Sequence, residues 1–415
     1  MHILAIETSC DETAVSLVDC SGDPWKGGVN FNVLSNIVLS QAKLHAEYGG
    51  VYPSLAKREH AENLIPVLKK ALELSSLESG IRNQESGIDT QKLEKILQRE
   101  PELLKQFLEF IPTIEKPAID KIVVTRGPGL EPALWVGINF AKALGEVWNI
   151  PVSGINHMEG HVFSALLQKR RDLPQLTTYN LQPTTFPALA LLISGGHTEL
   201  VLMKDWLKYE IVGETKDDAV GEAFDKVARM LGLGYPGGPE IARQAAQFQD
   251  KPSLKLPRPM LDSGDFNFSF SGLKTAVLYE IKKNNKFQPE ADPPSRPEAD
   301  QPQAGAETSK IIQEFAHEFQ EAATDVLVSK TVKAAREYGA KTILVGGGVS
   351  ANQRIRDALT EQTTNNLPPT TKLLLSPLEL TGDNALMIAV AGYLRAALNK
   401  ECREEIAAHG TLRLA

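Results

Sequence analysis

The sequence ILAIETSCDETAVSLV at residues 3–18 contains two apolar runs, 3–8 and 13–18, separated by the polar turn Ser9-Cys10-Asp11-Glu12. Short runs rich in β-branched and aliphatic residues on either side of a polar turn are typical of a β-hairpin. We therefore expect the chain to open with a hairpin.

The same pattern returns in the second half of the chain. Residues 188–203 read ALALLI and TELVLM around the turn SGGH. Ser194 and Thr198 repeat the spacing of Ser9 and Thr13. A second hairpin of the same design is expected here.

The segments after the two hairpins also resemble each other. IVVTRGPG (122–129) matches ILVGGGVS (343–350), and each leads into a helix, a second strand and a second helix that begins near His157 or Asp383. Such a duplication predicts an α/β protein with two lobes related by a pseudo-twofold axis and a central cleft between equivalent loops. Function is expected in that cleft.

Two histidines and an aspartate form a candidate metal site. His157 and His161 are four residues apart, so a helix would place both rings on one face, and Asn156 is a suitable N-cap for that helix. The duplication places Asp383 at the start of the equivalent helix of the other lobe. Two imidazoles and one carboxylate suit Fe(II) or Zn(II) with positions left for a substrate. A chance His pair and an N-cap role for Asp383 are the alternatives.

Glu159 does not fit the protease pattern HExxH, in which the glutamate directly follows the first histidine. It lies two positions after His157, about 200° round the helix. The motif therefore supplies no protease-type base.

Glycine turns and one acidic helix face are candidates for nucleotide binding. Gly195 and Gly196 would let backbone N–H groups approach phosphate oxygens. The helix predicted over 217–231 carries Asp225 on its polar face, where a nucleotide-binding protein could use it to bind ribose hydroxyls. Ordinary hairpin chemistry and a solvated helix face are the alternatives.

The composition is that of an ordinary globular protein. The 415 residues are 42% hydrophobic and 23% charged, enough for two lobes. The net charge of −8 argues against coating of nucleic acid by bulk charge, although a local basic groove stays open. Three cysteines form no disulfide framework, and no signal-like or membrane-length apolar run is present. We expect a cytoplasmic protein that does not associate with membranes.

Three segments depart from the repeated pattern. Residues 79–117 are polar and helix-forming and suggest an inserted helical appendage, residues 172–186 a shorter loop insertion, and the proline-rich acidic segment 285–309 a flexible linker. The expected lobes are 1–171 joined by the C-terminal helix 390–415, and 187–389. Lys57, Arg58 and His60 would lie on a solvated helix face, or alternatively on an edge that faces a nucleic acid.

Together the motifs resemble the tRNA adenosine threonylcarbamoyltransferases (TsaD type, formerly the glycoprotease family), within the actin/sugar-kinase/Hsp70-like superfamily. The resemblance covers nearly the whole chain. In chain order the matching motifs are IETSCDETAVSLV, GGVYPSLAKREH, TRGPGLEPALWVG, NHMEGH, LLISGGHTELV, DDAVGEAFDKVARMLGLGYPGGP, FSFSGLKTA, GGGVSANQRIR and GDNALMIAVAG. Ala385 departs from the glycine that many members carry there.

The resemblance implies a reaction and a set of residues. A threonylcarbamoyl group would pass from threonylcarbamoyl-adenylate to the exocyclic amine of the adenine beside the anticodon in ANN-reading tRNAs. His157, His161 and Asp383 would hold one Fe or Zn ion, and Asp11 and Glu12 match acidic residues needed for activity. The residues implied for the adenine nucleotide (threonylcarbamoyl-adenylate, ATP or AMP) are Leu192, Ile193, Ser194, Gly195, Gly196, His197, Thr198, Glu222, Asp225, Gly238, Gly347 and Asn352.

The resemblance also implies partners. These are tRNA, a paralogous TsaB-like protein and a small TsaE-like ATPase. Candidate tRNA contacts are Lys57, Arg58 and Lys274, and residues 79–117 begin beside the helical face that relatives use for pairing, so this segment is expected to alter partner docking. A small-molecule kinase of the same fold and a non-catalytic ATP-binding scaffold are the alternative functions, and neither needs the His pair.

Overall fold

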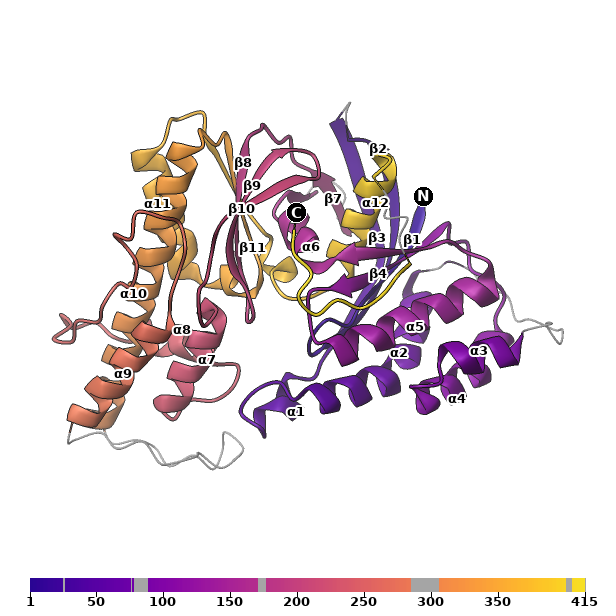
Figure 1. Ribbon diagram of the computed structural model, residues 1–415, viewed down its shortest axis with the longest axis horizontal. Coiled ribbons are helices and arrows are strands. Elements are labelled where there is room, and N and C mark those ends of the chain that lie inside the picture. Colours follow the sequence, from indigo (N-terminus) through magenta and orange to yellow (C-terminus); the bar gives the residue numbers. More distant parts are fainter. Residues whose placement is uncertain are drawn as a thin grey trace. The chain divides into compact units, whose positions relative to one another are not determined.

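The computed structural model describes residues 1–24, 27–75, 77, 89–170, 177–284, 306–400 and 405–414. Most of the predicted linker 285–309, the first part of 79–117 and residues 171–176 lie outside this description. The chain forms two compact α/β units, coloured along the sequence in Figure 1. The first comprises Met1–Gln41, Val51–Pro183 and Gly382–Leu414, and the second comprises Ala42–Gly50 and Thr184–Thr381. The lobe boundaries expected from the sequence stay a prediction.

The first unit is built on a seven-stranded sheet with the order β5-β4-β1-β2-β3-β7-β6. Its strands are β1 (His2–Glu7), β2 (Glu12–Asp23), β3 (Gly27–Ser40), β4 (Lys121–Gly127), β5 (Val152–Asn156), β6 (Leu167–Lys169) and β7 (Thr177–Leu181). β1 and β2 pair antiparallel, with Glu7 opposite Ala14, so the predicted opening hairpin is confirmed. β4 runs parallel to β1, and β5 parallel to β4.

Helices cover both faces of this sheet. They are α2 (Pro53–Ser75), α3 (Thr90–Ile96), α4 (Pro101–Phe110), η1 (Ile111–Thr113), α5 (Glu131–Trp148), α6 (His157–Ser164) and α12 (Ala385–Ala397). Successive residues of a strand point to opposite faces. Ile122 and Val124 of β4 accordingly join the apolar cluster of α2 and α5, whereas Val123 meets Gly392 of α12.

The described part of 79–117 belongs to the core of the first unit. Leu93, Leu97, Leu103 and Phe107 are at most 1% exposed and lie in the same apolar cluster as α2 and α5. Figure 1 shows α3 and α4 beside α5. The expected appendage is therefore wrong for these residues, because their apolar side chains complete the layer of helices rather than project from it.

The second unit repeats the strand order of the first. Its sheet runs β10-β9-β8-β11-β12, which corresponds to β3-β2-β1-β4-β5, so the predicted duplication is confirmed. The strands are β8 (Ala188–Ile193), β9 (Thr198–Asp205), β10 (Lys208–Glu214), β11 (Thr342–Gly346) and β12 (Lys372–Leu375). β8 and β9 form the second predicted hairpin, and β11 is parallel to β8.

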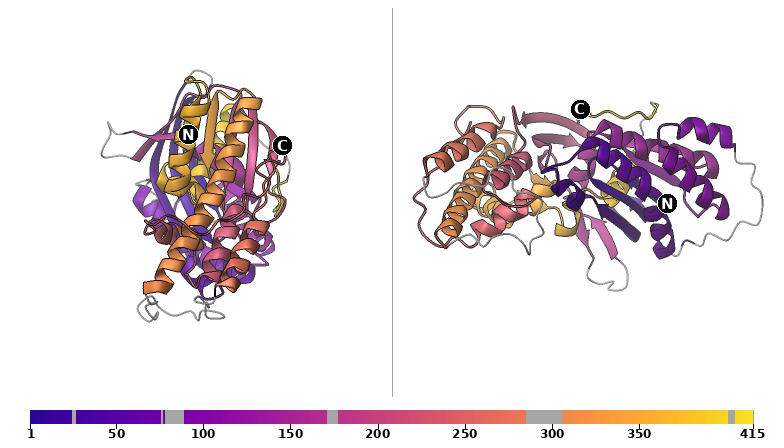
Figure 2. Two further views of the ribbon diagram at one scale, coloured as in Figure 1. Left: turned by 90° about the vertical axis from the view of Figure 1, so that its left-hand side faces the viewer. Right: turned by 90° about the horizontal axis from the view of Figure 1, so that it is seen from below.

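The helices of the second unit are α1 (Ala42–Ala46), α7 (Val220–Met230), α8 (Gly237–Ala245), α9 (Ser271–Lys283), α10 (Ala306–Glu337), η3 (Gly348–Ala351), α11 (Gln353–Asn366) and η4 (Leu378–Leu380). α10 and α11 lie side by side, facing the viewer on the left of Figure 2. Within the described ranges, no helix is both long and apolar enough to cross a membrane.

Candidate metal and nucleotide sites

The pair of histidines is positioned by the start of α6. Asn156 ends β5 and caps the helix, since its Oδ1 accepts hydrogen bonds from the backbone N–H groups of Met158 (2.9 Å) and Glu159 (3.3 Å). His157 and His161 then lie one turn apart, with ring centroids 4.7 Å from each other. The predicted cap and the shared helix face are confirmed.

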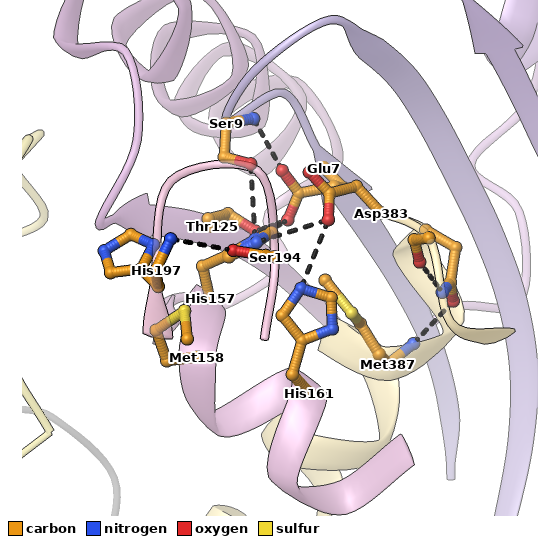
Figure 3. A network of polar contacts seen from close by, with 12 residues as sticks. Glu7, Ser9, Thr125, His157, Met158, His161, Ser194, His197, Asp383 and Met387 are labelled. Atoms are coloured by element: carbon orange, nitrogen blue, oxygen red, sulfur yellow. Dashed lines mark hydrogen bonds and ion pairs between the residues drawn. The ribbon is translucent and has the colours of Figure 1, made fainter. Parts of the chain in front are cut away.

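Asp383 completes a buried cluster with the two rings, as Figure 3 shows. Its Oδ1 is 3.4 Å from His157 Nε2 and 3.2 Å from His161 Nε2. The N-cap of α12 is Asn384, whose Oδ1 accepts from Met387 N at 3.0 Å. The alternative N-cap role of Asp383 is therefore wrong, and its carboxylate faces the imidazoles.

All three residues lie in the first unit, because the chain from Gly382 onward belongs to it. The expectation that Asp383 comes from the other lobe is wrong. The reason is packing: the face of α12 bearing Gly392 fits closely against Val123 of β4, where an added Cβ would come within 2.6 Å of a Val123 methyl group.

The cluster fits a divalent metal ion. One ligand atom from each of His157, His161 and Asp383 lies within 4.8 Å of the others. His161 is fully buried; its Nδ1 has no hydrogen-bond partner, and its Nε2 faces Asp383 Oδ1 at 3.2 Å without the geometry of a hydrogen bond. Buried polar atoms normally form hydrogen bonds, so an imidazole that only faces a carboxylate suits a metal ligand.

Glu7 contacts the ring nitrogen of His157 that faces away from Asp383. No role for this residue was predicted from the sequence. Its Oε2 accepts from His157 Nδ1 at 3.1 Å and from the Thr125 hydroxyl, and its Oε1 accepts from Ser9 N at 2.5 Å. A carboxylate on the far nitrogen of a ligating histidine fixes the ring and its tautomer. The sequence does contain a signal for this role, because Glu7 is a charged residue at the end of an otherwise apolar strand.

The protonation states follow from this arrangement. Burial disfavours the imidazolium of His157, but the charges of Asp383 and Glu7 outweigh it and raise the pKa of His157 well above its usual value. Burial lowers the pKa of His161, which is therefore neutral and able to ligate. Although burial opposes it, the charge of His157 lowers the pKa values of Glu7 and Asp383.

Asp11 and Glu12 occupy the turn between β1 and β2. Burial, and then the charges of Asp383 and Asp11, raise the pKa of Glu12 to about 9. The Ser40 hydroxyl donates to Glu12 Oε1 at 3.2 Å. Glu12 thus lies within the electrostatic field of the metal cluster and holds a proton near neutral pH.

His60 of α2 supports the same turn. It is fully buried, with Nε2 3.0 Å from the Cys10 carbonyl and Nδ1 2.7 Å from the Thr13 hydroxyl. Its expected place on a solvated helix face is wrong, because α2 packs against β2, the strand that follows this turn.

The predicted nucleotide residues gather in the second unit around the β8–β9 turn. Gly195 and Gly196 are exposed, and a Cβ added to either would meet no atom within 4 Å. The Thr198 hydroxyl accepts from Val220 N at 2.8 Å, which brings the N-terminus of α7 to the turn. Gly347 has φ 92°, and an added Cβ would lie 2.4 Å from the Ile193 carbonyl, so only glycine fits.

Several other members of the set already have partners or face the core. Leu192 and Ile193 are fully buried. Asp225 accepts from Gly237 N at 2.7 Å, and Glu222 pairs with Lys226 at 2.7 Å. The remaining members are His197, whose N–H donates to the Ser194 hydroxyl, Gly238 at the start of α8, and Asn352, which caps α11 and donates to Gln320.

The basic residues suggested for tRNA differ in exposure. Lys57 donates to the Arg99 carbonyl at 3.2 Å, and Lys274 pairs with Asp218 at 2.6 Å. The side chain of Arg58 is 64% exposed. Of the three, Arg58 is therefore the best placed to meet a partner in solution.

Known proteins of one family match almost the whole chain. The family model for TsaD, tRNA N6-adenosine threonylcarbamoyltransferase, matches residues 32–81 and 97–390. Proteins of that name from Persephonella marina and Thermosipho melanesiensis are 41% and 40% identical; each alignment covers 95% of this chain, and 90% and 94% of the relative respectively. The one from Bacillus subtilis is 38% identical, over 95% of this chain and 90% of its own.

These matches also correct the expected insertion, since residues 97–117 lie within the matched range and only 82–96 fall between its two parts. With a match of this extent, the chain belongs to the tRNA N6-adenosine threonylcarbamoyltransferase family.

Proposed function

We propose that this protein transfers a threonylcarbamoyl group from threonylcarbamoyl-adenylate to the exocyclic amine of the adenine beside the anticodon in ANN-reading tRNAs. The observation that carries the proposal is the buried cluster of His157, His161 and Asp383, supported by Glu7, in a chain of this family. A small-molecule kinase or an ATP-binding scaffold does not need the pair of histidines.

His157, His161 and Asp383 would hold one Fe or Zn ion. When bound, the ion supplies Lewis-acid polarisation of a carbonyl oxygen. Glu7 keeps the Nδ1 proton of His157 engaged, so Nε2 is the nitrogen that faces Asp383 and is available for ligation.

The residues of the β1–β2 turn would handle protons. The adenine amine forms a bond to the carbamoyl carbon, the bond from that carbon to the phosphate oxygen breaks, and AMP leaves. Asp11 would accept the proton released by the amine. Glu12, whose pKa is about 9, would keep its own proton and donate a hydrogen bond to an oxygen of the donor.

The second unit would bind the adenylate. The open turn at Gly195 and Gly196 presents backbone N–H groups suited to a phosphate, and the N-terminus of α7 beside it favours negative charge. Glu222, whose side chain is 46% accessible and pairs with Lys226, would be the acidic group that meets a ribose hydroxyl.

The partners belong to the proposal as well: tRNA as substrate, a paralogous TsaB-like protein and a small TsaE-like ATPase, all in the cytoplasm. A role of residues 79–117 in docking stays a prediction. Deleting the segment would remove Phe107 from the core, so substitutions of its exposed residues, such as Lys105→Glu, provide the cleaner test.

The experiment is nucleoside analysis of unmodified ANN-reading tRNA after incubation with threonylcarbamoyl-adenylate, this protein and the two partners. Threonylcarbamoyladenosine is expected with the intact protein. The yield of this product should fall by at least about 100-fold with Asp383→Ala, because the metal site loses a ligand. Glu73→Ala, a substitution at an exposed position, should leave the yield unchanged. No product, in a mixture where a known relative is active, would contradict the proposal.

A further inference from the structure

The C-terminal residues 405–414, here called the C-terminal strap, lie along the first unit and beyond residue 390, where the family match ends. Figure 1 shows the strap as the yellow trace that ends at the label C. It is bound through its backbone at three points: His409 N donates to the Arg126 carbonyl at 2.9 Å, the Gly410 carbonyl accepts from Gly129 N at 3.1 Å, and the Arg413 carbonyl accepts from Asn156 Nδ2 at 3.3 Å.

Packing holds the strap as well. Ala408 and Leu414 are 8% and 3% exposed. Gly127 has φ 139°, and a Cβ added there would lie 2.0 Å from the His409 carbonyl, so the end of β4 is shaped to let the strap pass. The C-terminal strap is therefore packed into the first unit by both hydrogen bonds and buried side chains.

Two of the strap's contacts reach the residues that position His157. Asn156, which donates to Arg413, uses its Oδ1 to cap α6 directly before His157. The amide side chain thus joins the strap to the first turn of the helix that carries both histidines. Fixing the amide orientation from one side fixes the capping oxygen on the other.

The second route passes through Ser9. Gly129 donates to the strap, and an added Cβ on Gly129 would lie 2.6 Å from the Ser9 carbonyl, which also accepts from Leu130 N at 2.7 Å. The Ser9 hydroxyl is 3.2 Å from His157 Nδ1. The strap therefore supports the helix cap before His157 and the serine beside its ring.

We propose that the C-terminal strap is a positioning element for the metal site, acting through Asn156 and the Gly129 turn on His157. The inference rests on the metal binding of the proposed function but not on the transfer reaction. It assigns a role to residues outside the part of the chain that the family model matches.

The test measures metal binding by the full-length protein with the strap released. Leu414→Asp places a charge at a buried position and should unseat the strap, whereas Thr411→Asp adds the same charge at an exposed position of the same segment. Carboxypeptidase digestion reports release. Co(II) binding, followed by its ligand-field absorption in competition with a chelator, should weaken about 10-fold for Leu414→Asp and stay unchanged for Thr411→Asp.

A second pair of variants covers the case in which Leu414→Asp does not fold. A chain that ends at residue 404 should bind Co(II) weakly and recover affinity when the synthetic peptide 405–415 is added, but not with a scrambled peptide. Asn156→Ser keeps a capping oxygen and loses the donor to Arg413, and should also weaken binding.

Unchanged Co(II) affinity in a variant whose strap is digested would overturn the inference. A wild-type protein that binds no Co(II), or binds it equally with His157→Ala, would instead contradict the metal site itself. The two failures are thus distinguishable.

Discussion

The environment of Glu12 differs strongly from that of an exposed carboxyl group. It is half-buried beside two other carboxylates, Asp11 and Asp383, and it carries a proton where an exposed glutamate would be ionised. Such a group contributes to the free energy of unfolding in acid, and this contribution is lost as the pH rises. The same property makes it useful to a reaction that needs a protonated carboxyl group as hydrogen-bond donor near neutral pH.

A pH dependence of stability is expected for the metal-free protein. The pKa of Glu12 rises from 4.5 to about 9 on folding, so the folded state binds the proton more tightly. Its contribution is fully present below pH 4.5 and is lost as the pH rises towards 9. Urea unfolding between pH 5 and 8 should show a free energy of unfolding that declines more steeply for the wild type than for Glu12→Gln.

The exposed substitution Glu73→Gln provides the matched control for this change of charge, and its profile should follow the wild type. Parallel profiles for the wild type and Glu12→Gln would show that Glu12 does not titrate as described. A metal ion beside Asp383 adds positive charge, so the decline should flatten when metal is added.

At the scale of elements, the site depends on how α6 and α12 are held together. Glu159 is fully buried in α6, and its two oxygens accept from Nε (2.5 Å) and Nη2 (3.1 Å) of Arg395 in α12. Gly160 lies against Met387, where an added Cβ would come within 2.9 Å of a side-chain carbon. The two-bond ion pair between Glu159 and Arg395 and the close contact at Gly160 therefore hold α6, which bears the histidines, against α12, which follows Asp383.

Breaking this ion pair should cost stability. Arg395→Met leaves Glu159 buried without its cation, and we expect the free energy of unfolding to fall by about 3 kcal/mol, as is typical when one partner of a buried pair is removed. The double variant Glu159→Gln with Arg395→Met should recover part of that loss, because no buried charge remains.

Urea unfolding measures both effects. Arg58→Met, at an exposed side chain, should change the free energy of unfolding by less than about 0.5 kcal/mol. Equal losses in the single and double variants would mean that the salt bridge is not the interaction that matters.

At the scale of the whole molecule, the two predicted ligands belong to different units. The residues predicted to hold a metal, His157, His161 and Asp383, lie in the first unit, and those predicted for the nucleotide, from Leu192 to Asn352, lie in the second. A ligand that binds only the folded state stabilises the unit that holds it.

Calorimetry should therefore distinguish the two units. Metal at about 100 times its dissociation constant should stabilise the first unit by about 2.7 kcal/mol, and AMP should act on the second. Limited proteolysis can assign each transition to its unit. With His161→Ala the metal response should disappear and the AMP response persist, and a metal response that shifts only the second unit's transition would contradict the assignment.

Local patterns in the sequence determined the two hairpins, their repetition, the helix capped by Asn156 and the spacing of His157 and His161. These features depend on residues a few positions apart, whose hydrophobic period and capping chemistry act within one element. The family motifs belong to the same level, since they too are contiguous runs of the chain.

Tertiary structure decided which unit Asp383 joins, that Asn384 rather than Asp383 caps α12, that His60 is buried, and that α3 and α4 complete a core. It also decided the role of Glu7, which meets His157 across 150 residues of sequence. No local period encodes such a pairing. Glu7 ends β1 and His157 follows β5, and these two residues meet because β1, β4 and β5 are parallel, so that their carboxyl ends lie at the same edge of the sheet.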